Sequence, residues 1–445
     1  MKKGDEILEK EIKLFVEDFM KKLNGQEVHI ISHFDTDGIT SASIMIHTLK
    51  KLDKKFSLKI VKSLNEEFIN ELPKEKLILF LDLASGSLNY IKNANLNNVF
   101  IIDHHEITQK IPENIQIINP QLTNKQKISS SGLTYLFCKE INPEIKELSK
   151  LAILGMIGDC LEKEIDSLNN GILEESEVQR KRGLLIYPST RPINRVLEYS
   201  SKPYIPEVTG NIKGVLELLR ESGLSPEKGK YKSLIELNEK EMKNLTTSIL
   251  LRNPKIKNKE LIGDIFLIKM FNKIEDAREL SALINACSRS GKPELAVQYC
   301  LEIPSSKKNV ELAHIKYKQK LISGLNFVSE TEKIEGKGFV IINAQDNIKD
   351  TMIGTIASII SNSSLYEEGT IITTMAYYED KIKVSARTVG RNGRNIRELL
   401  DRIVGFTGGD IGGHEHAAGC IISREKEKEF IDLLKKNLEI ELIKI

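Results

Sequence analysis

Short runs of apolar residues, each followed by polar residues, recur through the first 160 positions of the chain. Runs of four or five apolar residues bounded by turn residues are typical of strands that are buried on both faces. We expect such strands at Val28–Ser32, Leu77–Leu81, Val99–Ile102 and Gln116–Asn119. Helical periodicity is found at 39–49, 129–137 and 148–156, and an amphipathic helix precedes the first strand. This alternation predicts an α/β fold with a mostly parallel sheet covered by helices.

The pattern changes twice further along the chain. Four prolines between 186 and 210 indicate a connector, and from 211 to about 325 the periodicity is helical. From Gly338 a β-rich pattern begins again, with a helix at Ile353–Ser361, so we expect a second α/β domain. The predicted organisation is an N-terminal helix (1–24), a parallel-sheet domain (25–190), a connector with a helical middle region (191–328) and a C-terminal α/β domain (329–445).

Composition narrows the class of protein without naming a partner. With 445 residues, 40% hydrophobic and 29% charged, the chain is globular and long enough for several domains. Its net charge of +2 says little about what it binds. The five cysteines form no Cys-x-x-Cys motif, which suits reduced thiols. The N-terminus does not resemble a signal sequence, and no apolar run approaches the roughly 20 residues of a membrane span, so we expect a cytoplasmic protein with no membrane partner.

Acids and histidines follow the predicted strands, at the edge where α/β sheets bind ligands. Asp35 and Asp37 come after the first strand, Asp82 after the second, and Asp103, His104 and His105 after the third. If the backbone at 35–37 is extended, the two carboxylates lie on one side, about 6–7 Å apart along the chain. An acidic turn with a helix N-cap explains the same segment equally well.

Asp159 lies at the end of the predicted helix 148–156. A carboxylate is disfavoured there by the helix dipole, and a bound cation would explain it, although an ordinary loop aspartate is the commoner case. Oxygen and imidazole donors without thiolate favour Mn²⁺, with Mg²⁺ as the second choice, over structural zinc. Two such ions would activate water and hold a phosphodiester.

Basic residues and glycines gather near the C-terminus. Residues 381–404 hold seven Lys or Arg against two acids, which suits phosphate contact, although a solvated surface is the alternative. In FTGGDIGGHEHAAG the glycines let backbone N–H groups approach an anion, and His414 and His416 could donate to phosphate or form a metal pair. In the helical middle region, Arg278 and Arg289 fit a solvated helix face better than a nucleic-acid contact. We therefore expect a metal-dependent phosphoesterase with its active site in the cleft between the two α/β domains.

The ordered motifs HFDTDG, LDLASG, IDHHE, MIGD and GGHEHAAG resemble the DHH phosphoesterase family with its DHHA1 C-terminal domain. Within it, the chain is most similar to the archaeal homologues of the RecJ single-strand exonuclease, including the GINS-associated nuclease. The resemblance implies one metal held by His33, Asp35 and Asp82, and a second held by Asp37, Asp82, His104 and Asp159, with Asp82 as the bridge. His33 stands where bacterial RecJ has an acid, so its role stays open.

The same resemblance assigns catalytic and phosphate-binding residues. His105 would face the scissile phosphate, and Asp103 would orient the histidine pair. Arg387 and His414 would act on the substrate from the second domain, and the phosphate-binding set would be Arg387, Arg391, Gly412, Gly413, His414 and His416. One departure is Ile411, which precedes Gly412 and Gly413 where the family has a third glycine.

The implied function is single-strand-specific exonuclease activity in replication or repair, releasing mononucleotides by two-metal hydrolysis. DNA is the expected substrate and 5′ to 3′ the expected direction, although the sequence determines neither. The implied partners are single-stranded nucleic acid and the GINS complex of the replicative helicase. One alternative is a phosphodiesterase of the same superfamily that acts on RNA, short oligonucleotides or cyclic dinucleotides. The other is a replication scaffold without catalysis.

Overall fold

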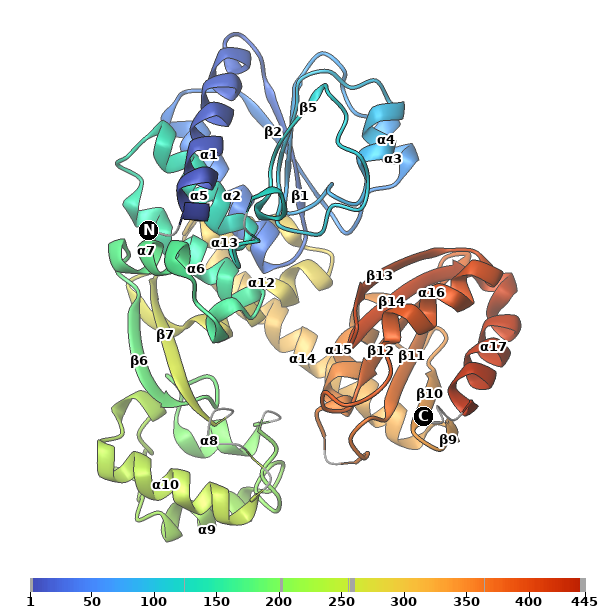
Figure 1. The fold of residues 1–445 in the computed structure, drawn as a ribbon. Coiled ribbons are helices and arrows are strands. Elements are labelled where there is room, and N and C mark those ends of the chain that lie inside the picture. Colours follow the sequence, from blue (N-terminus) through green and yellow to red (C-terminus); the bar gives the residue numbers. More distant parts are fainter. Residues whose placement is uncertain are drawn as a thin grey trace. The chain divides into compact units, whose positions relative to one another are not determined.

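A computed structural model describes residues 3–123, 125–200, 203–254, 256, 261–363 and 365–440 of the chain. The chain divides into two compact units, whose helices and strands are labelled in Figure 1. The first comprises Met1–Val196, Pro226–Lys243 and Lys257–His314, and the second Leu197–Ser225, Asn244–Ile256 and Ile315–Ile445. Within the described residues, no helix has both the length and the apolar character that a membrane span requires. The domain boundaries expected from the sequence stay predictions.

The first unit begins with alternating helices and strands, followed by helices and a small second sheet. Its elements are α1 (Lys3–Leu23), β1 (Val28–His33), α2 (Thr36–Lys51), β2 (Phe56–Val61), α3 (Glu66–Asn70), β3 (Leu77–Leu81), α4 (Leu88–Asn93), β4 (Val99–Ile102), β5 (Ile115–Ile118), α5 (Ser130–Ile141), α6 (Ser149–Gly158), α7 (Ser167–Glu175), β6 (Gln179–Leu184), β7 (Ile262–Met270), β8 (Lys273–Asp276), α12 (Ala277–Arg289) and α13 (Pro293–Cys300). Helices α8 (Ile193–Glu198), α10 (Glu239–Arg252) and α14 (Ser306–Glu330) have residues in both units.

The main sheet of the first unit is parallel throughout, in the order β2-β1-β3-β4-β5. The predicted parallel sheet is therefore confirmed. Strand β2 was not expected, because FSLKIV is half polar and its side chains are only partly buried at the sheet edge. The chain passes from β1 to β2 on one side and then crosses over β1 to β3 on the other side, from which it continues to β4 and β5. A ligand site is expected at the carboxyl ends of the strands at such a switch point.

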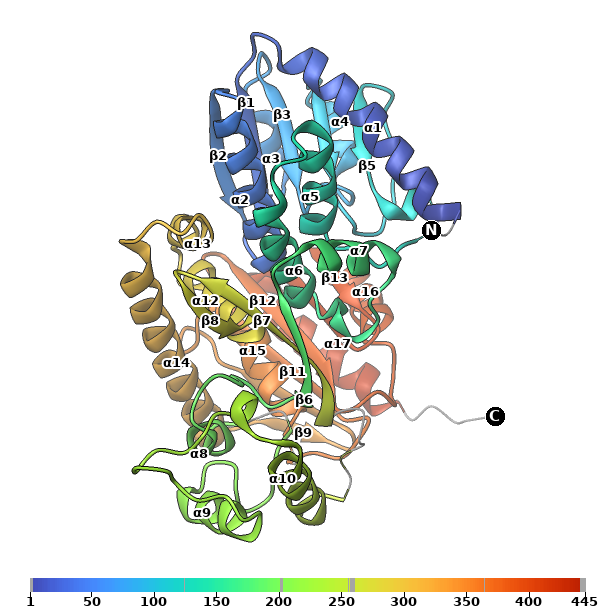
Figure 2. The ribbon, with the colours of Figure 1, turned by 90° about the vertical axis from the view of Figure 1, so that its left-hand side faces the viewer.

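Helices cover both faces of this sheet (Figure 2). Side chains alternate between the faces along each strand, so that Leu79 joins the core formed with α1, α2, α5 and α6, while Phe80 joins the core formed with α3 and α4. Every residue of β3 and β4 is buried, as the uninterrupted apolar runs predicted. Residues that follow these strands are therefore fixed at a rigid edge.

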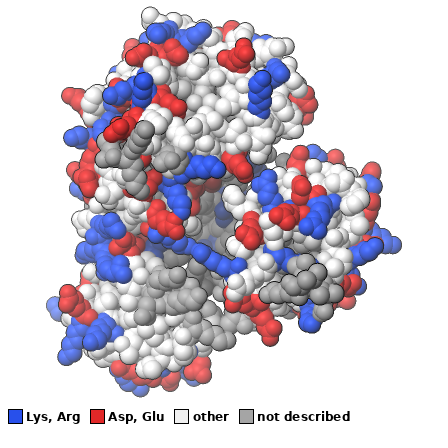
Figure 3. Space-filling view, viewed as in Figure 1, with Lys and Arg blue, Asp and Glu red and all other residues white. Residues whose placement is uncertain are grey.

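The middle of the chain is mostly helical, as expected, but it also holds strands that the helical pattern did not indicate. Strands β6, β7 and β8 form an antiparallel sheet in which β7 lies centrally. Strand β6 carries the exposed residues Arg180, Lys181 and Arg182. Figure 3 shows a group of basic side chains over β6, on a face where positive and negative residues are otherwise mixed. Arg180 is partly neutralised, because its guanidinium donates to Asp264 on β7.

The second unit contains the predicted C-terminal α/β domain. The elements that lie wholly within this unit are α9 (Ile212–Glu221), β9 (Ile334–Gly336), β10 (Phe339–Asn343), α15 (Asp350–Ser361), β11 (Ile371–Tyr378), β12 (Lys381–Thr388), α16 (Ile396–Thr407), β13 (Asp410–His414), β14 (Ala417–Ser423) and α17 (Glu427–Glu439). The sheet order is β13-β14-β12-β11-β10-β9, with β10 and β11 parallel and the other pairs antiparallel. Helices α16 and α17 pack on one face and α15 on the other.

Candidate metal centre and phosphate-binding face

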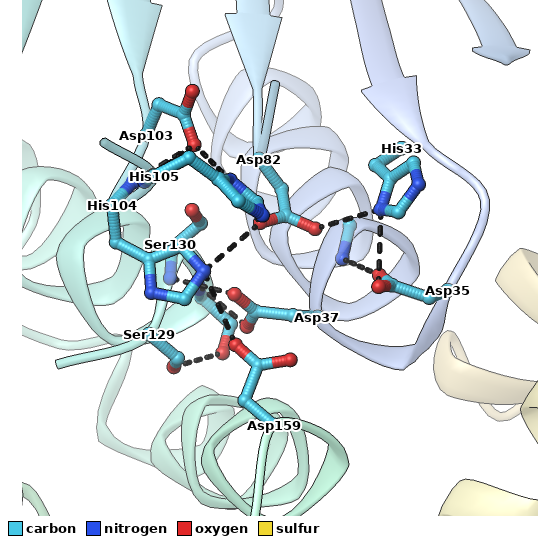
Figure 4. Close-up of polar contacts among 12 residues, drawn as sticks. His33, Asp35, Asp37, Asp82, Asp103, His104, His105, Ser129, Ser130 and Asp159 are labelled. Carbon is cyan, nitrogen blue, oxygen red and sulfur yellow. Dashed lines mark hydrogen bonds and ion pairs between the residues drawn. The ribbon is translucent and has the colours of Figure 1, made fainter. Parts of the chain in front are cut away.

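The loops after β1, β3 and β4 meet at one edge of the parallel sheet. The strand register places Ser32 beside Leu81 and Leu81 beside Ile102, so these strands end at the same level. The side chains that follow them point toward one another (Figure 4). The residues predicted as metal ligands lie in three groups, each with its ligand atoms within 4.8 Å of one another: His33 with Asp35 and Asp82, Asp37 with His104 and Asp159, and Asp82 with His104 and His105. The third group includes His105, which was not predicted as a metal ligand. The structure thus brings together acids that are far apart in the sequence.

The turn between β1 and α2 does not have the extended geometry expected from the sequence. Asp35 is the N-cap of α2, and its Oδ1 accepts a hydrogen bond from the Gly38 N–H at 3.1 Å. Asp37 lies inside the first helical turn and is fully buried. Of the two interpretations that the sequence left open, the helix N-cap is the one observed and the extended pair is not, because the helix starts at Thr36. Asp35 therefore caps α2 and lies in the cluster of candidate metal ligands at the same time.

Asp37 is held by the N-terminus of α5. Its Oδ2 accepts from the Ser130 N–H at 2.7 Å and its Oδ1 from the Ser131 N–H at 2.9 Å. An anion is favoured at a helix N-terminus, where unpaired N–H groups and the helix dipole both stabilise it. Gly155 on α6 permits this packing, since a Cβ there would lie 2.4 Å from Asp37 Oδ1. These two backbone donors had no signal in the sequence, whereas the paired glycines of LAILGMIGD could have suggested a close approach.

Asp82 occupies the centre of the cluster. It is 1% exposed and adopts a left-handed backbone conformation with φ 61°, which aspartate tolerates better than most residues. Its Oδ2 lies 3.3 Å from His33 Nδ1, and its Oδ1 lies 3.6 Å from His104 Nε2 but has no hydrogen-bond partner. An unsatisfied buried carboxylate oxygen is costly unless something else binds it.

Asp103 is fully buried and orients its neighbours. Its Oδ1 accepts from the His104 N–H at 2.8 Å and lies 2.7 Å from His105 Nδ1, while its Oδ2 accepts from the Ser85 N–H at 3.0 Å. This bond leaves Nε2 of His105 directed away from Asp103, on a side chain that is half exposed. The imidazole of His105 is thus fixed at the border of the cluster and in contact with solvent.

The electrostatics of the cluster favour a bound cation. Burial, together with the charges of Asp35 and Asp37, raises the pKa of Asp82, and burial with the charges of Asp37 and Asp82 raises the pKa of Asp159. Burial lowers the pKa of His104, which disfavours the imidazolium charge that would otherwise offset these acids. Burial would also lower the pKa of His33, but the charge of Asp35 outweighs it and the pKa is raised.

Asp159 is the C-cap of α6, as the sequence predicted, and its Oδ2 is a buried atom without a hydrogen-bond partner. Asp159 Oδ2 lies 3.3 Å from Nε2 of His104. A carboxylate oxygen and an imidazole lone pair at this distance repel each other unless a proton or a metal lies between them. Oxygen and imidazole donors of this kind suit Mn²⁺ or Mg²⁺.

The predicted phosphate-binding residues lie in the second unit. The strand register aligns His414, Ala417 and Arg387 in one row, and Gly412, Gly419 and Ser385 in the row two residues along, on the same face. Directly opposed residues of an antiparallel sheet share a face, so Arg387 and His414 lie on the same face, about 10 Å apart across two strand spacings. A Cβ at Gly412 would meet nothing within 4 Å, so the backbone beside His414 is open.

Arg394 and Arg397, which are among the seven basic residues in 381–404, donate hydrogen bonds to backbone carbonyl oxygens. Arg394 donates to the carbonyl oxygens of Asn437 and Ile440 at the end of α17, and Arg397 donates to the Gly413 carbonyl at 2.6 Å. These two side chains are thus bound to backbone of their own unit, and phosphate contact by the rest of the 381–404 cluster stays a prediction. Arg391 is exposed after β12, and His416 lies in the β13–β14 turn.

Arg387 is itself anchored. Its Nε donates to Ser358 on α15 at 3.0 Å and its Nη1 donates to the Ala386 carbonyl at 2.8 Å. Outside this region, Arg278 does not lie on a solvated helix face, since it is paired with buried Asp276 at 2.6 Å.

Comparisons with known proteins agree with this architecture. The chain matches the DHH family, N-terminal domain, over residues 27–158, the DHH-CID domain over 186–259 and the DHHA1 domain over 336–439. It is 31% identical to "Uncharacterized protein MJ0831" of Methanocaldococcus jannaschii over 91% of both chains. It is 26% identical to the single-stranded-DNA-specific exonuclease RecJ of Bacillus subtilis, but only over 31% of this chain and 19% of that protein.

Two solved structures show the same fold. RecJ from Thermus thermophilus, in complex with Mn²⁺, superposes with a TM-score of 0.62 at 16% identity and covers 97% of this chain. The chain spans about half of that protein, 55% of its length. CDC45 from Entamoeba histolytica superposes with a TM-score of 0.65 at 11% identity, over 96% of this chain and 99% of the other. At these identities the likeness concerns the fold alone.

Proposed function

This chain belongs to the RecJ-like DHH family, and on that premise we propose that it is a Mn²⁺- or Mg²⁺-dependent exonuclease acting on single-stranded nucleic acid. The observation that supports it is the convergence of four aspartates and three histidines at the carboxyl edge of the parallel sheet. DNA is the proposed substrate, hydrolysed from 5′ to 3′ with release of mononucleotides.

The residues of the cluster fit a pair of divalent cations. His33, Asp35 and Asp82 would hold one ion, and Asp37, His104 and Asp159 the other, with Asp82 shared between them. The buried oxygens Asp82 Oδ1 and Asp159 Oδ2 lack hydrogen-bond partners and would gain one in the bound ion. Two such cations would activate water for attack on a phosphodiester and offset the charge that develops on its oxygens.

The residues around the cluster would prepare it for this chemistry. Gly38, Ser130 and Ser131 hold the carboxylates of Asp35 and Asp37 through backbone N–H groups, which fixes their orientation before any ligand arrives. Asp103 holds His105 so that its Nε2 can donate to a phosphate oxygen. Burial would lower the pKa of His105, but the hydrogen bond with Asp103 outweighs it and the pKa is raised. A raised pKa favours the protonated imidazole, which is the form that can donate from Nε2.

In the second unit, Arg387, His414 and the open backbone at Gly412 would bind the phosphates of the substrate, with Arg391 and His416 beside them. The guanidinium of Arg387 is already ordered by Ser358, so little side-chain freedom would be lost on binding. Strands β12, β13 and β14 carry this set. A cytoplasmic location and docking to the GINS complex are also proposed.

A digestion assay tests the proposal. Single strands of DNA and RNA, labelled at the 5′ or 3′ end, are incubated with Mn²⁺ and the wild-type protein, Asp82→Asn, or the control Asp18→Asn, which changes an exposed acid on α1. We expect mononucleotide release from labelled DNA, a loss of at least about a hundredfold in Asp82→Asn, and no change in the control. Equal rates for the wild type and Asp82→Asn would refute the proposal.

Two alternatives give other outcomes in the same assay. Cleavage of dinucleotides with failure on long strands would favour a short-oligonucleotide phosphodiesterase. Binding of single strands without cleavage would favour a replication scaffold, an alternative that the CDC45 likeness raises at the level of fold. The complete donor set favours catalysis, because a scaffold has no use for this concentration of negative charge.

A further inference from the structure

Thr36 lies between Asp35 and Asp37 and is tied to a helix far along the chain. It is 1% exposed, and its hydroxyl donates to the Ser281 carbonyl oxygen on α12 at 3.2 Å. Ser281 Oγ lies 2.9 Å from Thr36 Oγ1 and can donate in return. The turn that presents two candidate ligands is therefore bonded on its outer side to α12.

The same threonine also contacts α6. A Cβ at position 158 would lie 2.8 Å from the Cβ of Thr36, so Gly158 is needed for the two helices to approach this closely. The residue after Gly158 is Asp159, a third candidate ligand. Thr36 is thus the point at which α2, α6 and α12 meet, one residue away from Asp35, Asp37 and, across the contact, Asp159.

The N-terminal end of α12 is anchored to a different segment. Its N-cap, Asp276, is fully buried and accepts from the Ser189 N–H at 2.9 Å. Arg278 donates to Asp276 and, through Nη1, to the Leu185 carbonyl at 2.9 Å. Arg191 adds a further pair with Glu279 at 3.1 Å. Residues 185–191 lead into the segment that matches the DHH-CID domain, so the root of that segment is fixed to the first turn of α12.

We propose that α12 is a positioning helix that couples the root of the 186–259 segment to the turn that carries Asp35 and Asp37. Ser281 lies about one helical turn beyond the anchored end, so a displacement of that end is passed to Thr36 through a single rigid element. Thr36 and Ser281 then act through the candidate ligands and do not touch a metal themselves. This inference rests on the proposed metal centre. It adds a route by which a displacement of the 186–259 segment regulates that centre.

Metal affinity separates positioning from ordinary packing. Mn²⁺ binding to the full-length protein is measured by isothermal titration calorimetry for Thr36→Val, which removes the hydroxyl at nearly constant shape, and for Thr36→Ser, which retains it. The matched control is Thr48→Val, because Thr48 is a buried threonine of the same helix whose hydroxyl donates to the Ile44 carbonyl within α2. We expect Thr36→Val to weaken Mn²⁺ binding about three- to tenfold, and Thr36→Ser and Thr48→Val to bind as the wild type does.

A second variant tests the coupling. Arg278→Lys keeps a charge beside Asp276 but cannot also reach the Leu185 carbonyl in the planar geometry of a guanidinium. We expect Arg278→Lys to weaken Mn²⁺ binding about two- to tenfold, and the double variant with Thr36→Val to bind no more weakly than Thr36→Val alone. Fully additive losses, or none in Arg278→Lys, would overturn the link between the segment root and the turn.

Hydrogen–deuterium exchange of the metal-free protein keeps the inference independent of the proposed function. Thr36→Val should speed exchange of the amides at 35–40, while Thr48→Val should not. Absence of Mn²⁺ binding by the wild type would refute the metal centre, but the exchange result would still decide whether α12 holds the turn. Unchanged exchange and unchanged affinity in Thr36→Val would refute the positioning role.

Discussion

Replacing Asp82 by asparagine should change the stability of the protein in opposite directions with and without metal. Asp82 is buried beside Asp35, with ligand oxygens within 4.8 Å of each other. Asparagine has nearly the same shape and tolerates the left-handed backbone at this position, so the fold need not adjust. The substitution therefore removes a charge while leaving the packing in place.

The magnitude follows from the separation of the charges. Two carboxylates no more than 4.8 Å apart repel each other by at least about 3.5 kcal/mol at an effective dielectric constant of 20. Because His33 offsets part of this repulsion, we expect Asp82→Asn to raise the metal-free free energy of unfolding by about 1–2 kcal/mol, or a few degrees in Tm. In contrast, Mn²⁺ at a hundred times its Kd stabilises the wild type by about 2.7 kcal/mol, and the variant by much less.

Thermal unfolding with and without Mn²⁺ tests whether the order of stability of the wild type and Asp82→Asn reverses. Asp18→Asn is the surface control. The pKa of Asp82 is raised, so its ionisation destabilises the fold as pH rises from the unfolded value near 3.8 through the folded value. The metal-free advantage of Asp82→Asn should accordingly be absent near pH 4 and grow toward neutral pH. A variant that melts below the wild type without metal would refute the charge-repulsion argument. Equal shifts with Mn²⁺ would refute a role for Asp82 as ligand.

Three further substitutions separate the roles of neighbouring groups. Ser130→Pro removes the N–H that binds Asp37, at a helix position where proline is accepted. Calorimetry should show Mn²⁺ affinity about ten- to a hundredfold weaker in this variant, whereas Ser130→Ala should match the wild type. Equal affinities of the two variants would contradict the role of α5. Arg387→Lys should weaken oligonucleotide binding about tenfold by fluorescence anisotropy in the Asp82→Asn background, with exposed Arg402→Lys as the silent control. Arg394→Ala should lower the free energy of unfolding by about 1 kcal/mol, because α17 loses the donor to its last carbonyls, and denaturant titration should show this without a change in oligonucleotide affinity.

Much of the candidate site could be predicted because it depends on strand ends. Four buried apolar runs, each followed by an acid or an asparagine, determine which residues reach the carboxyl edge of a parallel sheet. The geometry at 35–37 was left open between an extended pair and a helix N-cap, because one position decides whether Asp37 lies on a strand or in a helix. The residue types allow Asp35 both a capping and a ligand role, and only the structure shows that it caps α2 while lying within the cluster.

Other features could not be predicted because they depend on backbone atoms or on distant partners. The N–H groups of Ser130 and Ser131 that hold Asp37 are common to almost every residue type. The contact between Thr36 and Ser281 joins residues 245 positions apart. Arg394 and Arg397 could be counted as charges, but their carbonyl partners could not be inferred. Strand β7 is different, since its run IFLI was visible and was obscured by the surrounding helical periodicity.

The balance of charge in the cluster bears on whether the chain is an enzyme or a scaffold. The RecJ and CDC45 likenesses concern the fold alone, so the difference must come from the residues at the sheet edge. Four aspartates converge there, burial lowers the pKa of His104, and burial and mutual repulsion raise the pKa of Asp82 and of Asp159. Such an arrangement lowers the stability of the metal-free fold. Backbone contacts from α5 and close packing with α6 and α12 nevertheless hold Asp37 and Asp159 in place. A chain that used this fold only for docking would be more stable with neutral residues at these positions. The retained charges therefore support the catalytic proposal more strongly than the likeness of fold does.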